Sequence, residues 1–139
     1  MPGEVYKNIK FNIEGGVAHM ILARHDIRNA YSERDFTDEI LDVLSKVQIH
    51  PDVRVFVMSA QGTAFSAGGN IKDMKDKKGI FGGGTAGVRR GYIEGIQRIP
   101  KALYALDIPS ISAVQGPAIG AGCDPVSYTH LTLPTICSV

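Results

Sequence analysis

Apolar and β-branched residues gather in two short runs near the N-terminus, in the stretch VYKNIKFNIEGGVAHMILA. Glu14, Gly15 and Gly16 lie between the two runs, and consecutive glycines at such a point are typical of a tight turn. We therefore predict a β-hairpin whose strands cover residues 5–13 and 17–23.

The spacing of the apolar residues changes after Ser32. In SERDFTDEILDVLSKVQIH they recur at intervals of three and four, which is typical of one face of an amphipathic helix. We predict a helix with Ser32 as its N-cap that ends before Pro51, and its apolar stripe consists of Phe36, Ile40, Leu41, Leu44 and Val47. A second long helix is predicted over residues 88–106, with an inner face formed by Ile93, Ile96, Ile99 and Leu103.

Two further segments have the pattern of buried strands. VRVFVMSA is almost continuously apolar, which is typical of a parallel strand buried on both faces, and SISAVQG follows Pro109. Each strand leads into a turn of small residues and then into another helix. The intervening stretch KDKKGIFGGGTAG, residues 75–87, is predicted to be a mobile surface loop. A hairpin followed by alternating helices and strands indicates an α/β fold.

Composition narrows the functional classes. A chain of 139 residues with 44% hydrophobic and 21% charged residues is long enough for one globular domain with a real core. The net charge of +1 gives no general field for nucleic acid or an acidic membrane, and no apolar run is long enough to span a bilayer. The two cysteines have no metal-site spacing, and the N-terminus does not resemble a signal peptide. We expect a cytoplasmic protein without a metal site.

Two turns share one design. In VFVMSAQGTAFSAGGNIKDM and in SISAVQGPAIGAGCD, a buried strand runs into small residues where a helix begins. Backbone N–H groups at such a point have no helical partner, so they can bind an anion or stabilise a developing oxyanion. Glycine and alanine permit close approach of a ligand. Either turn alone fits simple chain reversal, but the pair indicates a ligand site.

The sequences of these two turns resemble the signatures of a known protein family. AFSAGGNIKDM, residues 64–74, resembles the first signature of the crotonase family of enoyl-CoA hydratases and isomerases, and PSISAVQGPAIGAGCD, residues 109–124, is similar to its second. We call these segments the first and second signatures. Their order and spacing also fit, as does the RNA tripeptide at residues 28–30. The resemblance covers residues 6–124, about half of a typical member. It implies a crotonase-like spiral of ββα turns, truncated here, that binds an acyl-CoA thioester.

The resemblance also implies roles for individual residues. The oxyanion hole falls on the backbone N–H groups of Gly69 and Ala121, and Asp124 falls where hydratases carry a catalytic Glu. The shorter Asp side chain moves the carboxylate by roughly 1.5 Å, a displacement large enough to affect rate strongly. Asn70 replaces the usual Asp and still suits a helix start. The positions expected to contact substrate or coenzyme A are Arg24, Arg28, Ala30, Ala67, Gly68, Asn70, Ile71, Lys72 and Gly120, with phosphate contacts from Arg24, Arg28 and Lys72.

The implied function is that of an enoyl-CoA hydratase/isomerase-type enzyme, a lyase or isomerase acting on an α,β-unsaturated acyl-CoA. No cofactor is implied, since coenzyme A is part of the substrate. The family's second acid belongs to the half absent here, so we expect the fragment to be inactive and the full-length form to be a homotrimer or a dimer of trimers.

Two alternatives stay open. One is a non-catalytic acyl-CoA- or RNA-binding protein on the same fold. The other is hydrolysis or proteolysis, which needs a nucleophile. Ser66 does not stand in a G-x-S-x-G motif, and we interpret it as a polar turn residue.

The C-terminal stretch looks foreign to the rest. Family members normally have Leu after the acid, whereas this chain has Pro125. The following run VSYTHLTLPT matches, residue for residue, what a common sequencing-library transposon adaptor encodes in this frame. We therefore predict that residues 1–125 are the N-terminal part of a crotonase-like acyl-CoA-binding domain and that residues 126–139 are a non-native tail.

Overall fold

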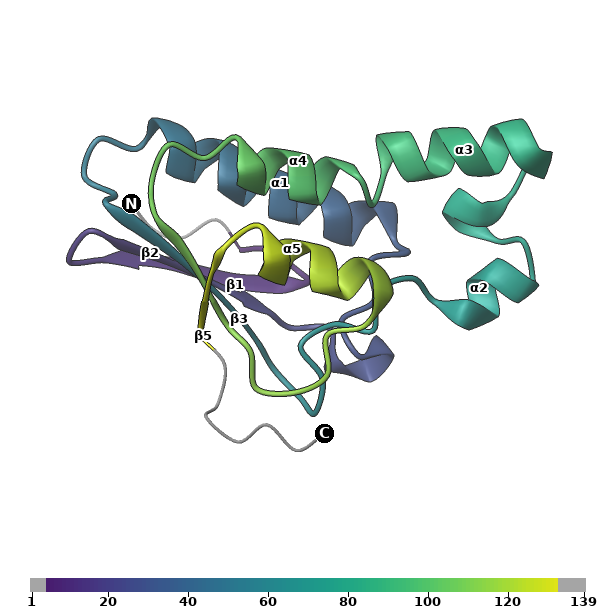
Figure 1. Cartoon of the computed structure of the whole chain (residues 1–139), viewed down its shortest axis with the longest axis horizontal. Coiled ribbons are helices and arrows are strands. Elements are labelled where there is room, and N and C mark those ends of the chain that lie inside the picture. The colour runs from purple at the N-terminus through teal and green to yellow at the C-terminus, as the bar shows by residue number, and fades with distance from the viewer. Residues whose placement is uncertain (1–4, 133–139) are drawn as a thin grey trace.

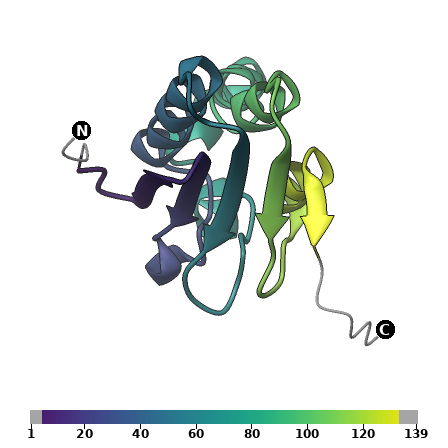
Figure 2. The same ribbon diagram turned by 90° about the vertical axis from the view of Figure 1, so that its left-hand side faces the viewer.

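The computed structural model describes residues 5–132, which contain one sheet of five strands in the order β1-β2-β3-β4-β5 (Figures 1 and 2). The hairpin strands are antiparallel, and every later neighbour is parallel. This arrangement confirms the predicted α/β fold with a hairpin at its start. The strands are β1 (Ile9–Glu14), β2 (Val17–Leu22), β3 (Val55–Ala60), β4 (Ser110–Ala113) and β5 (His130–Thr132).

The helices gather on one side of this sheet. Figure 1 shows α1 and α4 lying side by side along the sheet, whereas α2 and α3 project beyond one end. Within residues 5–132, no helix is long and apolar enough to cross a membrane. The α-helices are α1 (Arg34–Ile49), α2 (Ile71–Lys75), α3 (Gly84–Glu94), α4 (Arg98–Tyr104) and α5 (Cys123–Ser127), and the 3₁₀ turns are η1 (His25–Ile27), η2 (Gly79–Phe81) and η3 (Gly120–Gly122).

The core lies between the sheet and the pair α1 and α4. Four of the five predicted stripe residues of α1 are buried in it, and Leu41 is partly exposed. On β3 only Phe56 and Met58 are buried, so the expectation that this strand is buried on both faces is wrong. The buried apolar side chains that form the centre of the core are Ala18, Met20, Leu22, Phe36, Ile40, Val43, Leu44, Val47, Phe56, Met58, Ile99 and Leu103.

The first strand is shorter than predicted. It begins at Ile9, because the backbone N–H groups of Lys7 and Asn8 donate to the Glu39 carboxylate at 3.0 and 2.8 Å. Lys7 and Asn8 are therefore attached to α1, although the Asn8 carbonyl still accepts from the Ala23 N–H at 3.0 Å, just after the end of β2.

Ser32 is not the N-cap of α1, contrary to the prediction. Glu33 occupies that position and makes no side-chain capping hydrogen bond. The Ser32 hydroxyl instead accepts a hydrogen bond from the Asn70 N–H at 2.6 Å, within the first signature. A residue type suited to capping is thus used for a long-range contact.

The second long helix is also interrupted, so its prediction as one element is wrong. α3 ends at Glu94, because the backbone of the next residue, Gly95, is not helical, and α4 starts at Arg98. Pro100 has no N–H to donate and is tolerated in the first turn of a helix, which favours a new start just before it. Ile96, Ile99 and Leu103 are buried as predicted, whereas Ile93 is exposed.

The glycine-rich stretch of residues 75–87 is not simply a surface loop. It contains η2 and the start of α3, and both Ile80 and Phe81 are buried. α3 packs on η2 through Gly91, where an added Cβ would meet the Ile80 carbonyl. The apolar pair within this polar stretch was the signal for burial.

The chain after Asp124 packs against the body as far as it is described. Val126 is buried, the Tyr128 and Tyr104 rings make an edge contact at 6.0 Å, and the Thr129 and Ser112 hydroxyls lie 2.7 Å apart. Residues 133–139 lie outside the described residues. The non-native origin of residues 126–139 stays a prediction, because packing does not report where a segment came from.

Candidate functional site

The two signatures lie side by side. An isolated parallel bridge pairs Ser66 with Ala118, although 52 positions separate them in the printed sequence. The Phe65 N–H donates to the Pro117 carbonyl and the Ile119 N–H donates to the Ser66 carbonyl, each at 3.0 Å. The pairing that the sequence only suggested is therefore made by backbone hydrogen bonds.

Two glycines let the signatures touch. Gly68 has φ of 74°, and an added Cβ would lie 2.9 Å from the Ala121 nitrogen. On the other side, a Cβ on Gly122 would lie 2.8 Å from the Ser66 side chain. These distances are too short for real contacts, so a side chain at either position would push the two turns apart.

The two predicted oxyanion donors sit at this contact. In the described part of the chain, neither the Gly69 N–H nor the Ala121 N–H donates a hydrogen bond to another protein group. Both residues are partly exposed. Ile71 and Ile119 flank them and are 79% and 61% exposed, respectively. Two unpaired donors beside apolar surface suit a polarised carbonyl attached to an apolar group.

Asp124 lies at the edge of the same arrangement. It is the second residue of α5, it is exposed, and it follows Ala121 by less than one helical turn. Among the described residues, no group of three His, Cys, Asp or Glu side chains could hold a metal ion. The polar groups predicted for the site within residues 5–132 are thus two backbone donors and one carboxylate, and their roles stay predictions.

Asn29 supports the turns of the site through its side-chain hydrogen bonds, a role that was not predicted from the sequence. It is fully buried with φ of 54°, and its side-chain oxygen accepts from the Arg24 N–H at 2.9 Å. Its amide nitrogen donates to the carbonyls of Gln61 and Ala64 at 3.0 and 3.1 Å. Asn tolerates this left-handed conformation better than most residues. The Asn in the tripeptide of residues 28–30 was therefore the feature of the sequence that pointed to an unusual backbone here.

We expect Asn29→Ala to destabilise the chain by roughly 2–4 kcal/mol. The change removes the partner of the Arg24 N–H and of the Gln61 carbonyl, each hydrogen bond being worth about 0.5–1.5 kcal/mol, and it puts alanine in a left-handed conformation. Urea unfolding measures the effect. The matched control is Asn12→Ala on the exposed side of β1. Equal stability of the two variants would show that Asn29 does not hold the loop.

Ser66 acts as a turn residue, as interpreted from the sequence. It is fully buried, its hydroxyl donates to the Asn29 carbonyl at 2.8 Å, and it accepts from the Gly68 N–H at 3.1 Å. The backbone of residues 28–30 runs beside Ser66, since the Ala67 N–H donates to the Arg28 carbonyl at 2.9 Å. The hydroxyl therefore supports the turn.

The residues expected to contact coenzyme A differ in their surroundings. Arg24 donates to Asp26 at 2.9 Å and also to Glu33. The hydrogen bonds with Glu33 and then Asp26 raise the pKa of Arg24, and the guanidinium lowers the pKa of both carboxylates. Arg28 and Lys72 are exposed and have no ion-pair partner in residues 5–132. They are better placed than Arg24 to receive a phosphate.

The remaining predicted positions differ in their exposure and contacts. Ala30 and Gly68 are buried, so they serve the packing of the turns. Asn70 accepts from the Lys72 N–H at 3.0 Å, which confirms it as the residue that starts α2. Ala67 and Gly120 are at least partly exposed near the donors. Their contacts with a ligand stay predictions.

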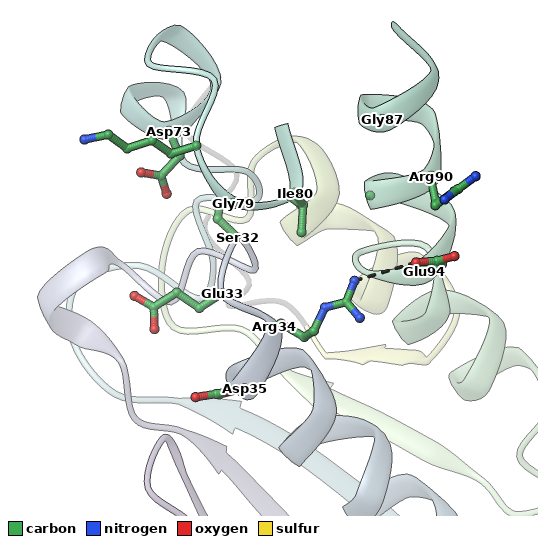
Figure 3. A pocket seen from close by; sticks show the side chains of 12 residues that line it. Ser32, Glu33, Arg34, Asp35, Asp73, Gly79, Ile80, Gly87, Arg90 and Glu94 are labelled. Carbon is green, nitrogen blue, oxygen red and sulfur yellow. Dashed lines mark ion pairs between the residues drawn. The ribbon is translucent and has the colours of Figure 1, made fainter. Parts of the chain in front are cut away.

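A pocket with a volume of about 650 Å³ lies between the start of α1, η2 and α3. Figure 3 shows the ion pair of Arg34 with Glu94 at its border, and the two charged groups lie 3.7 Å apart. Its lining includes Ser32 and Asp73 but neither Gly69, Ala121 nor Asp124. The pocket is thus a neighbour of the signatures and does not contain the predicted chemistry.

Several known proteins are similar to this chain in sequence. The family model for Enoyl-CoA hydratase/isomerase matches residues 12–133. The chain is 31% identical over 135 residues to hydroxycinnamoyl-CoA hydratase-lyase of Pseudomonas fluorescens, covering 92% of this chain and 45% of the relative. It is 30% identical over 132 residues to the peroxisomal Delta(3,5)-Delta(2,4)-dienoyl-CoA isomerase of Arabidopsis thaliana, covering 89% and 47%.

Solved structures agree on the fold. An enoyl-CoA hydratase from Shewanella pealeana superposes with a TM-score of 0.78 at 25% identity, covering 89% of this chain and 45% of that one. An enoyl-CoA hydratase/isomerase from Xanthobacter autotrophicus gives a TM-score of 0.79 at 22% identity, covering 90% and 45%. The chain spans about half the length of these relatives. It has the crotonase fold over that half and belongs to the enoyl-CoA hydratase/isomerase family.

Proposed function

We propose that the full-length protein is an enoyl-CoA hydratase or isomerase acting on an α,β-unsaturated acyl-CoA thioester. The observation that carries this proposal is the contact between the signatures, which leaves the N–H groups of Gly69 and Ala121 unpaired beside Asp124. Relatives named as a hydratase-lyase and a dienoyl-CoA isomerase support the same substrate class. Because the chain spans about half of these relatives, we propose that it is inactive by itself.

The two backbone donors stabilise charge. The thioester carbonyl oxygen accepts hydrogen bonds from Gly69 and Ala121, and these bonds strengthen as the oxygen becomes negative in the enolate-like transition state. The close contact of the two signatures at Gly68 and Gly122 holds the donors in place before substrate arrives, so no reorganisation is needed at the moment of reaction.

Asp124 supplies the acid/base chemistry. Its carboxylate orients a water or moves a proton at the α or β carbon of the acyl group. A second carboxylate from the remaining half of the full-length protein completes the pair. Arg28 and Lys72 attract the phosphates of coenzyme A, and Ile71 and Ile119 provide apolar surface for the rest of the ligand. We further propose a homotrimer or a dimer of trimers for the full-length form.

Gly69→Val tests the oxyanion assignment. An added Cβ lies 3.4 Å from the Phe81 ring and against the end of Met74, so the branched side chain crowds the donor. We expect the wild-type chain to bind a non-hydrolysable crotonyl-CoA analogue at least tenfold more tightly than free coenzyme A, and the variant to lose this preference. Isothermal titration measures both affinities.

Free coenzyme A is the matched ligand control, because it has the same phosphates and lacks the thioester carbonyl. A variant that keeps the thioester preference would contradict the assignment. Binding of RNA without binding of either coenzyme A ligand would instead support the non-catalytic alternative.

A further inference from the structure

Positive charge is concentrated on the part of the chain that projects beyond the sheet. We call residues 71–94, which contain α2, η2 and α3, the basic arm (Figure 1). The arm has six Lys or Arg and three Asp or Glu residues, a net charge of +3, whereas the rest of the chain has nine and eleven, a net charge of −2. The small net charge of the whole chain therefore conceals a basic surface.

Most of this charge is not neutralised by neighbouring side chains. Within residues 5–132, the only arm cation with an ion-pair partner is Lys78, which lies 3.6 Å from Asp76. Glu94, another of the arm's acids, pairs with Arg34 outside the arm. The arm cations without such a partner in this part of the chain are all exposed: Lys72, Lys75, Lys77, Arg89 and Arg90.

An aliphatic side chain stands among the cations of α3. Ile93 is 39% exposed and lies next to Arg89 and Arg90, because residues three and four positions apart are neighbours on a helix surface. Gly91 packs on η2, and residues two positions apart point in nearly opposite directions, so Ile93 points away from η2. The exposure of Ile93 thus combines an apolar contact with two guanidinium groups.

The residue types of the arm suit a lipid surface better than a nucleic acid. On α2, Ile71 is 79% exposed and shares a face with Lys75, four positions later. The arm's two aromatic rings pack on each other, since Phe81 is buried and its ring lies 5.6 Å from that of Tyr92. Bases of single strands stack on exposed aromatic rings, whereas a bilayer interface accepts cations together with aliphatic side chains.

Lys77 has a backbone conformation that favours glycine. It follows the C-cap of α2 with φ of 52°, and its N–H donates to the Met74 carbonyl at 3.3 Å. A lysine here is less stable than a glycine, because only glycine adopts the left-handed region without strain. A charge held in a strained position is expected where the charge serves binding.

We propose that the basic arm binds the surface of a lipid bilayer that contains anionic headgroups. Lys75, Lys77, Arg89 and Arg90 attract the headgroups, and Ile93 enters the boundary between the headgroups and the acyl chains. The proposal does not depend on the proposed function, in which none of these five residues takes part.

Vesicle flotation of the 139-residue chain tests the proposal. We expect the chain to bind phosphatidylcholine vesicles with about one third phosphatidylserine roughly 100-fold more tightly than pure phosphatidylcholine vesicles, and the difference to shrink at high salt. Equal binding to both kinds of vesicle would overturn the proposal. Tighter binding of a single-stranded RNA than of the anionic vesicles would also overturn it.

A triple variant with Lys75→Gln, Arg89→Gln and Arg90→Gln locates the contact. We expect it to bind the anionic vesicles roughly 100-fold more weakly, because each cation near such a surface contributes a factor of about five. The matched control loses the same charge through Gln at three exposed lysines outside the arm: Lys7, Lys10 and Lys101. Equal weakening by the two triple variants would show that net charge, and not the arm, decides binding.

Lys77→Gly separates binding from folding. We expect the variant to bind the anionic vesicles about fivefold more weakly and to melt about 2–4 °C higher, because it loses one cation and relieves the strained backbone. Wild-type affinity in this variant would contradict the role of the Lys77 charge.

Discussion

Replacing Asp124 with Asn is expected to lower turnover of a short or aromatic enoyl-CoA by roughly 100- to 10,000-fold in the full-length enzyme, the usual effect of one general acid/base group. Binding of the thioester should stay nearly unchanged, since the donors at Gly69 and Ala121 belong to the backbone. Asn has almost the same shape as Asp but cannot take up or release a proton near neutral pH. Loss of absorbance of the conjugated thioester measures turnover, and titration calorimetry measures binding.

The control for this change is Asp52→Asn, an exposed position in the turn after α1. It removes one negative charge from the chain and leaves the signatures untouched, so we expect full activity. Full activity of the Asp124 variant would show that Asp124 only starts α5. The acid/base groups would then lie in the other half of the protein.

Gly68→Ala is expected to disrupt both signatures together. The new Cβ would stand 2.9 Å from the Ala121 nitrogen at φ of 74°. The left-handed conformation costs alanine about 1–2 kcal/mol, and forcing two backbone segments apart costs about 1–3 kcal/mol more. We expect a loss of stability of roughly 2–5 kcal/mol in urea unfolding and loss of the preference for a thioester over free coenzyme A.

Gly15→Ala separates strain from crowding. Gly15 has φ of 58° in the hairpin turn, and nothing lies within 4 Å of an added Cβ. This variant therefore has the backbone penalty alone, and its ligand preference should equal that of the wild type. Similar losses in the two variants would mean that the contact between the signatures contributes nothing measurable.

Several patterns that depend on near neighbours were predicted correctly. Most of the α1 stripe follows from the spacing of its apolar residues, because one buried face repeats every 3.6 residues in a helix, and the hairpin turn follows from its consecutive glycines. The strand β3 follows from its nearly continuous apolar run, although only one of its faces is buried. The signatures were recognisable for a related reason. A close approach of two backbones requires small residues, and glycine at positions 68 and 122 meets this requirement.

Contacts between distant segments were not predictable in the same way. Ser32 suits a helix cap and a hydrogen bond to Asn70 equally well, and only the folded chain brings Asn70 within 2.6 Å of it. Gly95 and Pro100 are each tolerated in or near a helix, and the break between α3 and α4 depends on how α4 packs on α1.

The residues of the candidate site also differ in how far they could be predicted from the sequence. Local residue types indicated that the two turns could bind a ligand, whereas the roles of Gly69, Ala121 and Asp124 came from the resemblance to the family signatures and stay predictions. The supporting role of Asn29 could not be predicted. Its side chain donates to carbonyls more than 30 positions away along the chain, and a hydrogen bond of that kind depends on where the tertiary structure places both partners.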